Sequence, residues 1–237
     1  MNSGLSLLLD FAFPCYCVSC GIPVSSKTNH LCSRCFKSLK RAGGGCPVCS
    51  SLMDEEGCGF CSGRRFYPSK HISLFEYEGA VKGIIHSLKF GGIRNVYKVL
   101  TPFLADSLEE FGSSIDFITS VPMNRKKYAA RGYNQSELLA LFLSKASGIP
   151  FRRILREKKG SAHQREFSYS ARYINVIDRY ETISNCNINE KTILLIDDVF
   201  TTGATINECS RILLDSGASS VFSLTVARSD LKKLENI

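Results

Sequence analysis

The chain has 237 residues, 44% of them hydrophobic, a formal net charge of +8 and a pI of about 8.9. This length allows one sizeable core, or one domain with a small module. No apolar run approaches the ~20 residues of a membrane helix. The N-terminus lacks the basic region and cleavage site of a signal peptide. We therefore expect a cytoplasmic protein without membrane insertion, whose N-terminus forms a short helix. The positive charge permits phosphate-rich partners, from a small phosphoester to a nucleic acid.

Nine of the eleven cysteines precede residue 62. A disulfide framework would require a secreted context, whereas the repeated C-x-x-C spacing turns two thiolates toward one tetrahedral metal centre. Eight thiolates match two Zn²⁺ ions with four ligands each. The predicted metal ligands are Cys17, Cys20, Cys32, Cys35, Cys46, Cys49, Cys58 and Cys61.

The pairing of these cysteines has two solutions. Neighbouring pairs would form two successive ribbons, and a cross-braced arrangement is the alternative; iron–sulfur ligation also uses four thiolates. The segment 12–66 has few branched aliphatic residues and many Gly and Ser, so metal binding would supply its folding free energy. We predict an N-terminal segment and cysteine-rich module over 1–66, a small double zinc-ribbon module with two structural zinc ions.

In the remaining chain, 67–237, segments with the hydrophobic periodicity of a strand alternate with segments that have the periodicity of a helix. A strand is expected over 71–78, with helices over 80–88 and 95–111. A strand over 115–122 leads to a basic loop over 123–133, and a helix capped by Asn134 or Ser136 ends at Gly148. Further strands are expected at 151–155, 192–196 and 221–227, and a helix at 205–215. This order predicts an α/β fold with a mostly parallel central sheet.

Ligands of such sheets bind outside the carboxyl ends of the strands. Three polar loops follow strands here: 122–133, 156–172 and 197–204. The last begins with Asp197 and Asp198 and contains the sequence TTGAT. A turn that opens a helix presents unpaired backbone N–H groups and a favourable dipole, so it suits a phosphate. The carboxylates would bind sugar hydroxyls or share Mg²⁺ with the ligand, a layout that fits ribose 5-phosphate.

Other nucleotide and phosphate motifs do not fit this stretch. The P-loop string G-x-x-x-x-G-K-[ST] and the dinucleotide string G-x-G-x-x-G are absent from the sequence. A D-x-D phosphatase motif is also missing. A receiver domain would need over a hundred residues after its acidic pair, and only 39 follow Asp198.

The stretch DDVFTTGAT resembles the 5-phosphoribosyl-1-pyrophosphate (PRPP) motif of type I phosphoribosyltransferases. The whole chain is similar to the ComF family, which joins C-x-x-C knuckles to such a domain. The resemblance includes the cysteine pairs, Leu88-Lys89-Phe90, Val121-Pro122, Arg131 to Gln135, Gln164, Arg172, Asn175 and Ala227-Arg228. Tyr133 and Ser161 depart from the usual Phe and Thr.

The resemblance implies a type I phosphoribosyltransferase fold over 67–237 and Mg²⁺-dependent transfer of a phosphoribosyl group to an unknown acceptor. It implies catalytic roles for Asp197, Asp198 and Arg131, and a mobile lid over 156–172. The two aspartates would hold the ribose hydroxyls. The 5-phosphate would bind at Thr201, Thr202, Gly203, Ala204 and Thr205. The pyrophosphate would meet Arg125, Lys126, Lys127 and Arg131.

The basic loops have more than one interpretation. Residues 125–131 carry four positive charges and no negative one, which suits pyrophosphate. Tyrosines interleaved with basic residues also suit single-stranded DNA, through base stacking, and a solvated surface is the third reading. Lys89 is a further candidate for a phosphate contact. The resemblance links the chain to DNA uptake and its proteins, so the alternative to an enzyme is a non-catalytic PRPP or nucleotide sensor that binds single-stranded DNA.

Overall fold

The computed structural model describes residues 15–24, 30–42, 45–46, 48–50, 53, 58, 61, 65–90, 95–112, 114–158, 178–183 and 186–229. The short helix predicted at the N-terminus lies outside these residues. In the described part, no helix is long and apolar enough to cross a membrane. The module boundary at residue 66 stays a prediction.

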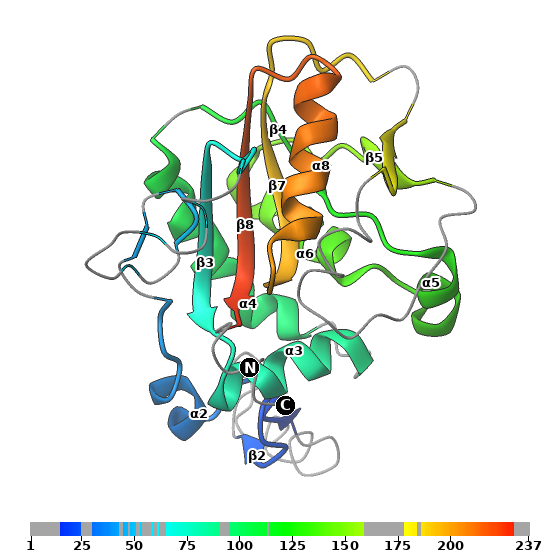
Figure 1. Cartoon of the computed structure of the whole chain (residues 1–237). Helices are drawn as coiled ribbons and strands as arrows, with labels where there is room; N and C mark the ends of the chain where they lie inside the picture. Colours follow the sequence, from blue (N-terminus) through cyan, green and yellow to red (C-terminus); the bar gives the residue numbers. More distant parts are fainter. Residues whose placement is uncertain are drawn as a thin grey trace.

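A four-stranded parallel sheet forms the centre of the molecule (Figure 1), in the order β3 (Lys70–Glu76), β8 (Ser220–Arg228), β7 (Thr192–Phe200) and β4 (Phe117–Ser120). The predicted parallel sheet is therefore confirmed. Strand β7 is longer than the predicted 192–196, because Val199 and Phe200 stay in register with Ala227 and Arg228 of β8. The two aspartates consequently lie inside β7, close to its carboxyl end.

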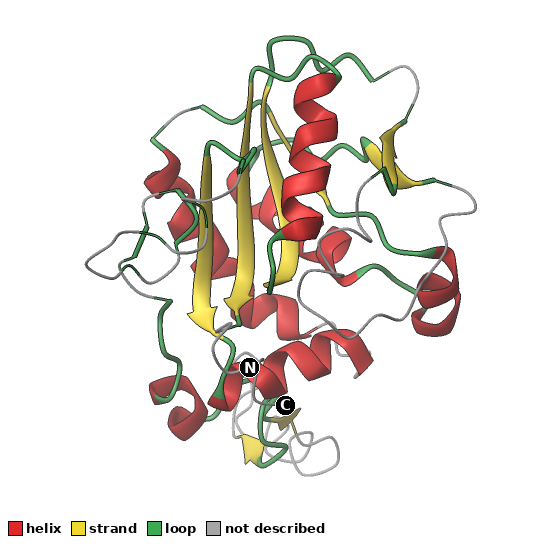
Figure 2. Cartoon of the chain, viewed as in Figure 1, coloured by secondary structure: helices red, strands yellow, loops and turns green. Residues whose placement is uncertain are grey.

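Helices cover both faces of this sheet (Figure 2). Helices α3 (Gly79–Phe90), α4 (Asn95–Asp106) and α6 (Gln135–Ser147) pack on one face, with a 3-10 turn, η1 (Ser107–Phe111), after α4. Helix α8 (Ala204–Asp215) packs on the other. Leu194 and Ile196 face the first set, whereas Ile193 and Leu195 face α8. The continuous apolar run of β7 follows from this two-sided burial.

The predicted basic loop over 123–133 was wrong in part, because it contains helix α5 (Arg125–Arg131). The Asn124 side chain accepts a hydrogen bond from the Lys126 N–H at 2.8 Å. Gly132 ends the helix in the left-handed region, at φ 80°. An Asn cap and a Gly stop therefore build a short helix from a sequence without an apolar face.

A two-stranded antiparallel ribbon of β5 (Leu155–Glu157) and β6 (Tyr180–Thr182) lies beside α5 in Figure 1. Phe151, in the strand predicted at 151–155, forms a single parallel bridge to Ile118. Most of the predicted lid over 156–172 lies outside the described residues. The described residues on either side of that gap are joined by this ribbon.

The cysteine-rich segment includes β1 (Cys15–Tyr16), β2 (Pro23–Val24) and α2 (Ser33–Lys37). Its first part docks on α3: Ser19 Oγ donates to the Ala80 carbonyl at 3.0 Å, and Ser87 Oγ donates to the Val18 carbonyl at 2.6 Å. A Cβ at Gly83 would lie 2.4 Å from the Ser19 carbonyl oxygen. Only glycine permits this close approach.

Candidate functional site

A cavity of about 280 Å³ opens at the carboxyl ends of β4 and β7. We call it the acidic cavity. It contains the two aspartates, basic side chains from α3 and α5, Arg179 next to β6, and the first turn of α8. Its lining residues include Lys89, Lys127, Arg131, Gln135, Ser136, Glu157, Arg179, Tyr180, Asp197, Asp198 and Thr205. This position is the one expected for a ligand site of a parallel sheet.

Asp198 is the charge-compensated member of the acidic pair. Its Oδ2 lies 2.8 Å from Lys89 Nζ, and the Asp198 side chain is 8% exposed. Gln135 Nε2 donates to the same oxygen at 3.4 Å. Arg131 in turn donates to Gln135 Oε1 and packs against the Phe90 ring. Helices α3, α5 and α6 therefore converge on one carboxylate.

Asp197 accepts its hydrogen bonds from neutral groups. Its Oδ1 accepts hydrogen bonds from Ser136 Oγ at 2.7 Å and from the Asp198 N–H at 2.9 Å. Burial, and then the charge of Asp198, raise the pKa of Asp197 to about 7, and the Ser136 hydrogen bond opposes this rise. Two adjacent carboxylates thus have different surroundings, one beside an ammonium group and one beside a hydroxyl.

The turn 201–205 joins β7 to α8 next to the acidic pair. Gly203 is the N-cap of α8, at φ 68° in the left-handed region, and Thr202 Oγ1 accepts from the Ala204 N–H at 3.3 Å. Thr205 reaches the acidic cavity. The start of a twelve-residue helix with glycine as its cap offers N–H groups and a positive dipole end beside the cavity.

The four basic residues predicted around the pyrophosphate do not share one cavity. Lys127 and Arg131 line the acidic cavity, whereas Arg125 lines a second cavity of about 330 Å³ and Lys126 is exposed. Met123 lines both cavities. The second cavity also contains Tyr128, Arg153 and Arg156; Arg153 pairs with Glu137 and Arg156 with Glu181.

The β5–β6 ribbon forms one wall of the acidic cavity. Glu157 and Arg179 both line it, and Arg179 Nε donates to Glu157 Oε1 at 2.5 Å. Tyr180 lies beside them, 6% exposed, and burial raises the pKa of its hydroxyl. The prediction of a loop at 156–172 pointed to this side of the site, but it did not identify this partly buried ion pair. Positions 157 and 179 are too far apart in sequence for a spacing rule to join them.

The cysteines form two groups of four, Cys17/Cys20/Cys32/Cys35 and Cys46/Cys49/Cys58/Cys61, with all sulfur atoms of a group within 4.8 Å of one another. We call them the first and second cysteine groups. Each group therefore combines two C-x-x-C pairs that are neighbours in the sequence, and the pairs are not cross-braced. The Sγ–Sγ distances are 3.8 Å for Cys20–Cys32 and 3.5 Å for Cys49–Cys58. Zn–S bonds of about 2.3 Å place tetrahedron corners about 3.8 Å apart. Each group could hold one metal ion.

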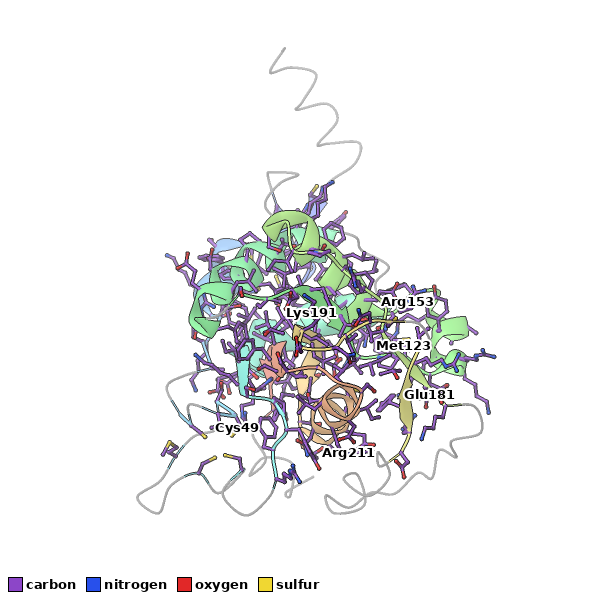
Figure 3. The ribbon with its side chains drawn as sticks, turned by 90° about the horizontal axis from the view of Figure 1, so that it is seen from above. Cys49, Met123, Arg153, Glu181, Lys191 and Arg211 are labelled. Carbon is purple, nitrogen blue, oxygen red and sulfur yellow. The ribbon has the colours of Figure 1, made fainter. Side chains whose placement is uncertain are left out.

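The two groups lie in different parts of the core. Cys17 and Cys35 pack with the hydrophobic cluster of α3, α4 and α6. Cys46, Cys49 and Cys58 pack with the cluster of α8. Figure 3 shows Cys49 on the opposite side of the molecule from Met123 and Arg153. The cysteine-rich segment therefore extends over two sides of the sheet.

These features define a class of protein. It combines an α/β fold, an acidic pair at the carboxyl end of its sheet and two groups of four cysteines. The chain is 30% identical to competence protein ComFC of Streptococcus pneumoniae over 204 residues, 84% of this chain and 87% of that protein. It is 25% identical to competence protein ComFC of Bacillus subtilis, over 90% and 84% of the two chains. DNA utilization protein YhgH of Escherichia coli K12 is 25% identical, over 88% and 94%. The chain belongs to the ComF family. No protein-family model matches it.

Solved structures with similar folds include two adenine phosphoribosyltransferases. An adenine phosphoribosyltransferase aligns over 61% of this chain and 77% of its own, at 17% identity and a TM-score of 0.40. Adenine phosphoribosyltransferase of Saccharomyces cerevisiae aligns over 73% and 88%, at 15% identity and a TM-score of 0.40. These values do not bear on activity.

Proposed function

We propose that the acidic cavity binds PRPP with Mg²⁺ and that the chain transfers the phosphoribosyl group to a nitrogen nucleophile, in the cytoplasm. One observation carries this proposal. A carboxylate pair, cationic side chains and a helix N-terminus line one cavity of about 280 Å³ at the carboxyl end of the sheet. A ligand with vicinal hydroxyls and phosphates at both ends matches all three features.

The roles follow from the position of each group. Asp197 and Asp198 accept hydrogen bonds from the ribose 2- and 3-hydroxyls, and the turn 201–205 binds the 5-phosphate through backbone N–H groups and threonine hydroxyls. Lys127 and Arg131 neutralise the pyrophosphate. Lys89, already 2.8 Å from Asp198, is the nearest cation to the ribose side of the ligand. Arg125 and Lys126 contribute only long-range charge.

In the proposed reaction, the bond between C1 and the pyrophosphate oxygen breaks and the acceptor nitrogen bonds to C1. Pyrophosphate leaves with the bonding electrons, and the nitrogen loses a proton. Positive charge develops on the ribose ring, as in glycoside chemistry, and the two carboxylates stabilise it. Lys127 and Arg131 stabilise the leaving group. The β5–β6 ribbon limits the access of water from its side of the cavity.

The donor set fits Mg²⁺, because two carboxylates at one cavity wall supply the hard oxygen ligands that this ion prefers. When bound, Mg²⁺ offsets the negative charge of the pyrophosphate and the aspartates. The four-sulfur groups fit Zn²⁺, whose thiolate sites are tetrahedral. We propose two structural zinc ions, one in each cysteine group.

The test is calorimetric titration of Mg·PRPP into the wild type and the Asp197→Asn/Asp198→Asn variant. We expect binding to the wild type and a loss of at least about tenfold in affinity in the variant, since each lost charged hydrogen bond is worth about 1.5–3 kcal/mol. Asp116→Asn is the matched control, because Asp116 pairs with Lys191 away from the cavity. A wild type that does not bind Mg·PRPP would refute the proposal.

A second function is favoured by the second cavity, where the exposed Tyr128 lies among arginines. Stacking on tyrosine and cationic contacts suit single-stranded DNA. In this alternative, the chain senses PRPP or a nucleotide without turnover and binds DNA for uptake, together with other uptake proteins. DNA affinity should fall steeply with salt and be lower in Tyr128→Ala. Failure to bind DNA at low salt would rule it out.

A further inference from the structure

The side chain of Arg228 joins the second cysteine group to the end of β7. Arg228 is the last residue of β8, pairs in register with Phe200 and is 9% exposed. Its Nη1 donates to the Cys49 carbonyl at 2.6 Å, and its guanidinium lies 4.7 Å from the centroid of the Phe200 ring. A buried guanidinium is costly unless it is bonded. The cysteine knuckle therefore supplies a contact that this arginine needs.

Asn207 makes a separate connection to the first turn of α8. It is 6% exposed, and its Oδ1 accepts from the Tyr67 N–H at 2.7 Å. Its Nδ2 donates to the Arg65 carbonyl at 3.1 Å. Residues 65–67 follow the last ligand of the second group, Cys61, by only a few positions. The side chain thus ties the helix start to the segment that leaves this group.

Aromatic contacts also connect the end of β7 with the segment of the second cysteine group. The Phe200 ring stacks on His71 at 4.1 Å and meets Phe66 edge-on at 6.2 Å. The His71 N–H donates to the Val48 carbonyl, inside the second group, at 2.7 Å. Cys49 belongs to the same hydrophobic cluster as Phe200. Strand β7 thus ends against the segment that carries the second group.

These contacts hold both sides of the turn 201–205. Phe200 precedes the turn and Asn207 follows it, and both are held by chain segments that surround the second cysteine group. Such a segment, poor in branched aliphatic residues, takes its folding free energy from its metal. The segment that carries the first group contacts α3 and α4 instead, away from the turn 201–205.

We propose that metal in the second cysteine group and ligand in the acidic cavity are coupled, with Arg228 and Asn207 as the positioning residues that connect them. The identity of the ligand rests on the proposed function. Bound metal fixes Val48, Cys49 and residues 65–67, which fix Phe200 and the first turn of α8, and so set the geometry of the turn 201–205. Coupling is reciprocal by thermodynamic necessity. A ligand bound in the cavity must therefore strengthen the retention of this metal.

The experiment measures zinc release from the full zinc-loaded chain to the chromogenic chelator 4-(2-pyridylazo)resorcinol, with and without Mg·PRPP. Cys20→Ser weakens the first group and Cys61→Ser the second, so these variants assign the release phases. We expect Mg·PRPP to slow release from the second group by about fivefold or more, within the range of measured couplings, and to leave the first group nearly unchanged.

Arg228→Met and Asn207→Ala test the two connections separately. Methionine keeps the apolar stem and removes the buried charge, a change that folded cores tolerate. In both variants we expect weaker Mg·PRPP binding by calorimetry and no slowing of zinc release by Mg·PRPP. Arg211→Met is the matched control on α8, where Arg211 pairs with Glu208 and Asp215; it should behave as the wild type.

The outcomes separate this inference from the proposed function. If the wild type binds Mg·PRPP and zinc release is unchanged, the coupling is refuted and the proposed function stands. If the wild type does not bind Mg·PRPP, both fail. The Asp197→Asn/Asp198→Asn variant should show no slowing, which excludes zinc capture by free PRPP as the cause.

Discussion

At the residue scale, the two aspartates of β7 differ in what compensates their charge. Asp198 has an ammonium group at 2.8 Å, whereas Asp197 has a hydroxyl at 2.7 Å. A ligand in the acidic cavity therefore meets one carboxylate paired with an ammonium group and one that changes charge near neutral pH. This asymmetry makes Asp197 the group whose protonation should be visible in stability.

We predict that Asp197 makes the protein less stable as pH rises from about 4 to about 7. Its pKa is raised to about 7 in the folded chain and is about 3.9 in an unfolded chain. Between these values the folded state binds the extra proton, so its stability falls as pH rises. Asp197→Asn removes this dependence. Urea denaturation at pH 5 and pH 8 should show that the variant gains, relative to the wild type, on the order of 1–3 kcal/mol at pH 8.

Asp116→Asn provides a control of opposite sign. The Thr192 N–H, and then Lys191, lower the pKa of Asp116. The stability that Asp116 contributes is therefore present at neutral pH and is lost as pH falls through the lowered pKa. The control variant should therefore lose stability at pH 8 and match the wild type in acid. Parallel pH profiles for the wild type and Asp197→Asn would contradict the assignment of a raised pKa.

At the element scale, the start of α8 depends on one backbone conformation. Gly203 has φ 68°, and a side chain in this region costs about 1–2 kcal/mol. The sequence predicted the turn and the helix well, because Gly after a strand and two threonines is a strong local signal. The sequence did not predict α5, because residues 125–131 have no apolar periodicity. Only the Asn124 and Gly132 caps define this helix.

We predict that Gly203→Ala lowers the free energy of unfolding by about 1–2 kcal/mol and weakens Mg·PRPP binding at least tenfold, because the strain falls on the proposed phosphate contacts. Gly112→Ala is the matched control: it has φ 63°, and its added Cβ would have no atom within 4 Å. This control should lose similar stability and bind Mg·PRPP as the wild type does. Equal effects of the two substitutions on binding would contradict a role for the turn 201–205.

At the scale of the whole molecule, the cysteine-rich segment is built into the core. Four C-x-x-C pairs were enough to predict two four-cysteine groups, because thiolate spacing is a local property. Their docking was not predictable: the contacts of Arg228 with Cys49 and of Asn207 with Arg65 join positions 179 and 142 residues apart. The contacts of the aspartates with Lys89 and Ser136 could not be predicted, for the same reason. Hydrophobic periodicity and composition do not encode pairs that are distant in sequence.

We predict that Gly83→Ala releases the metal of the first cysteine group faster. The added Cβ would lie 2.4 Å from the Ser19 carbonyl oxygen, so α3 and the first group must move apart, at a cost of about 1–3 kcal/mol. Zinc release to a chelator and urea denaturation measure both effects. Lys82→Ala, on the same helix at an exposed position, is the control. An unchanged release rate in Gly83→Ala would show that this contact does not hold the first group.

The chain before β3 also covers the outer side of that strand. The Ala42 N–H donates to the Leu74 carbonyl at 3.1 Å, and the Glu76 N–H donates to the Lys40 carbonyl at 2.9 Å. An uncovered edge strand offers its free backbone groups to other chains and promotes aggregation. A chain shortened to begin at residue 67 would expose β3 in this way. The cysteine-rich segment therefore protects this edge from pairing with other chains, and we expect the loss of metal to be seen first as self-association of the protein.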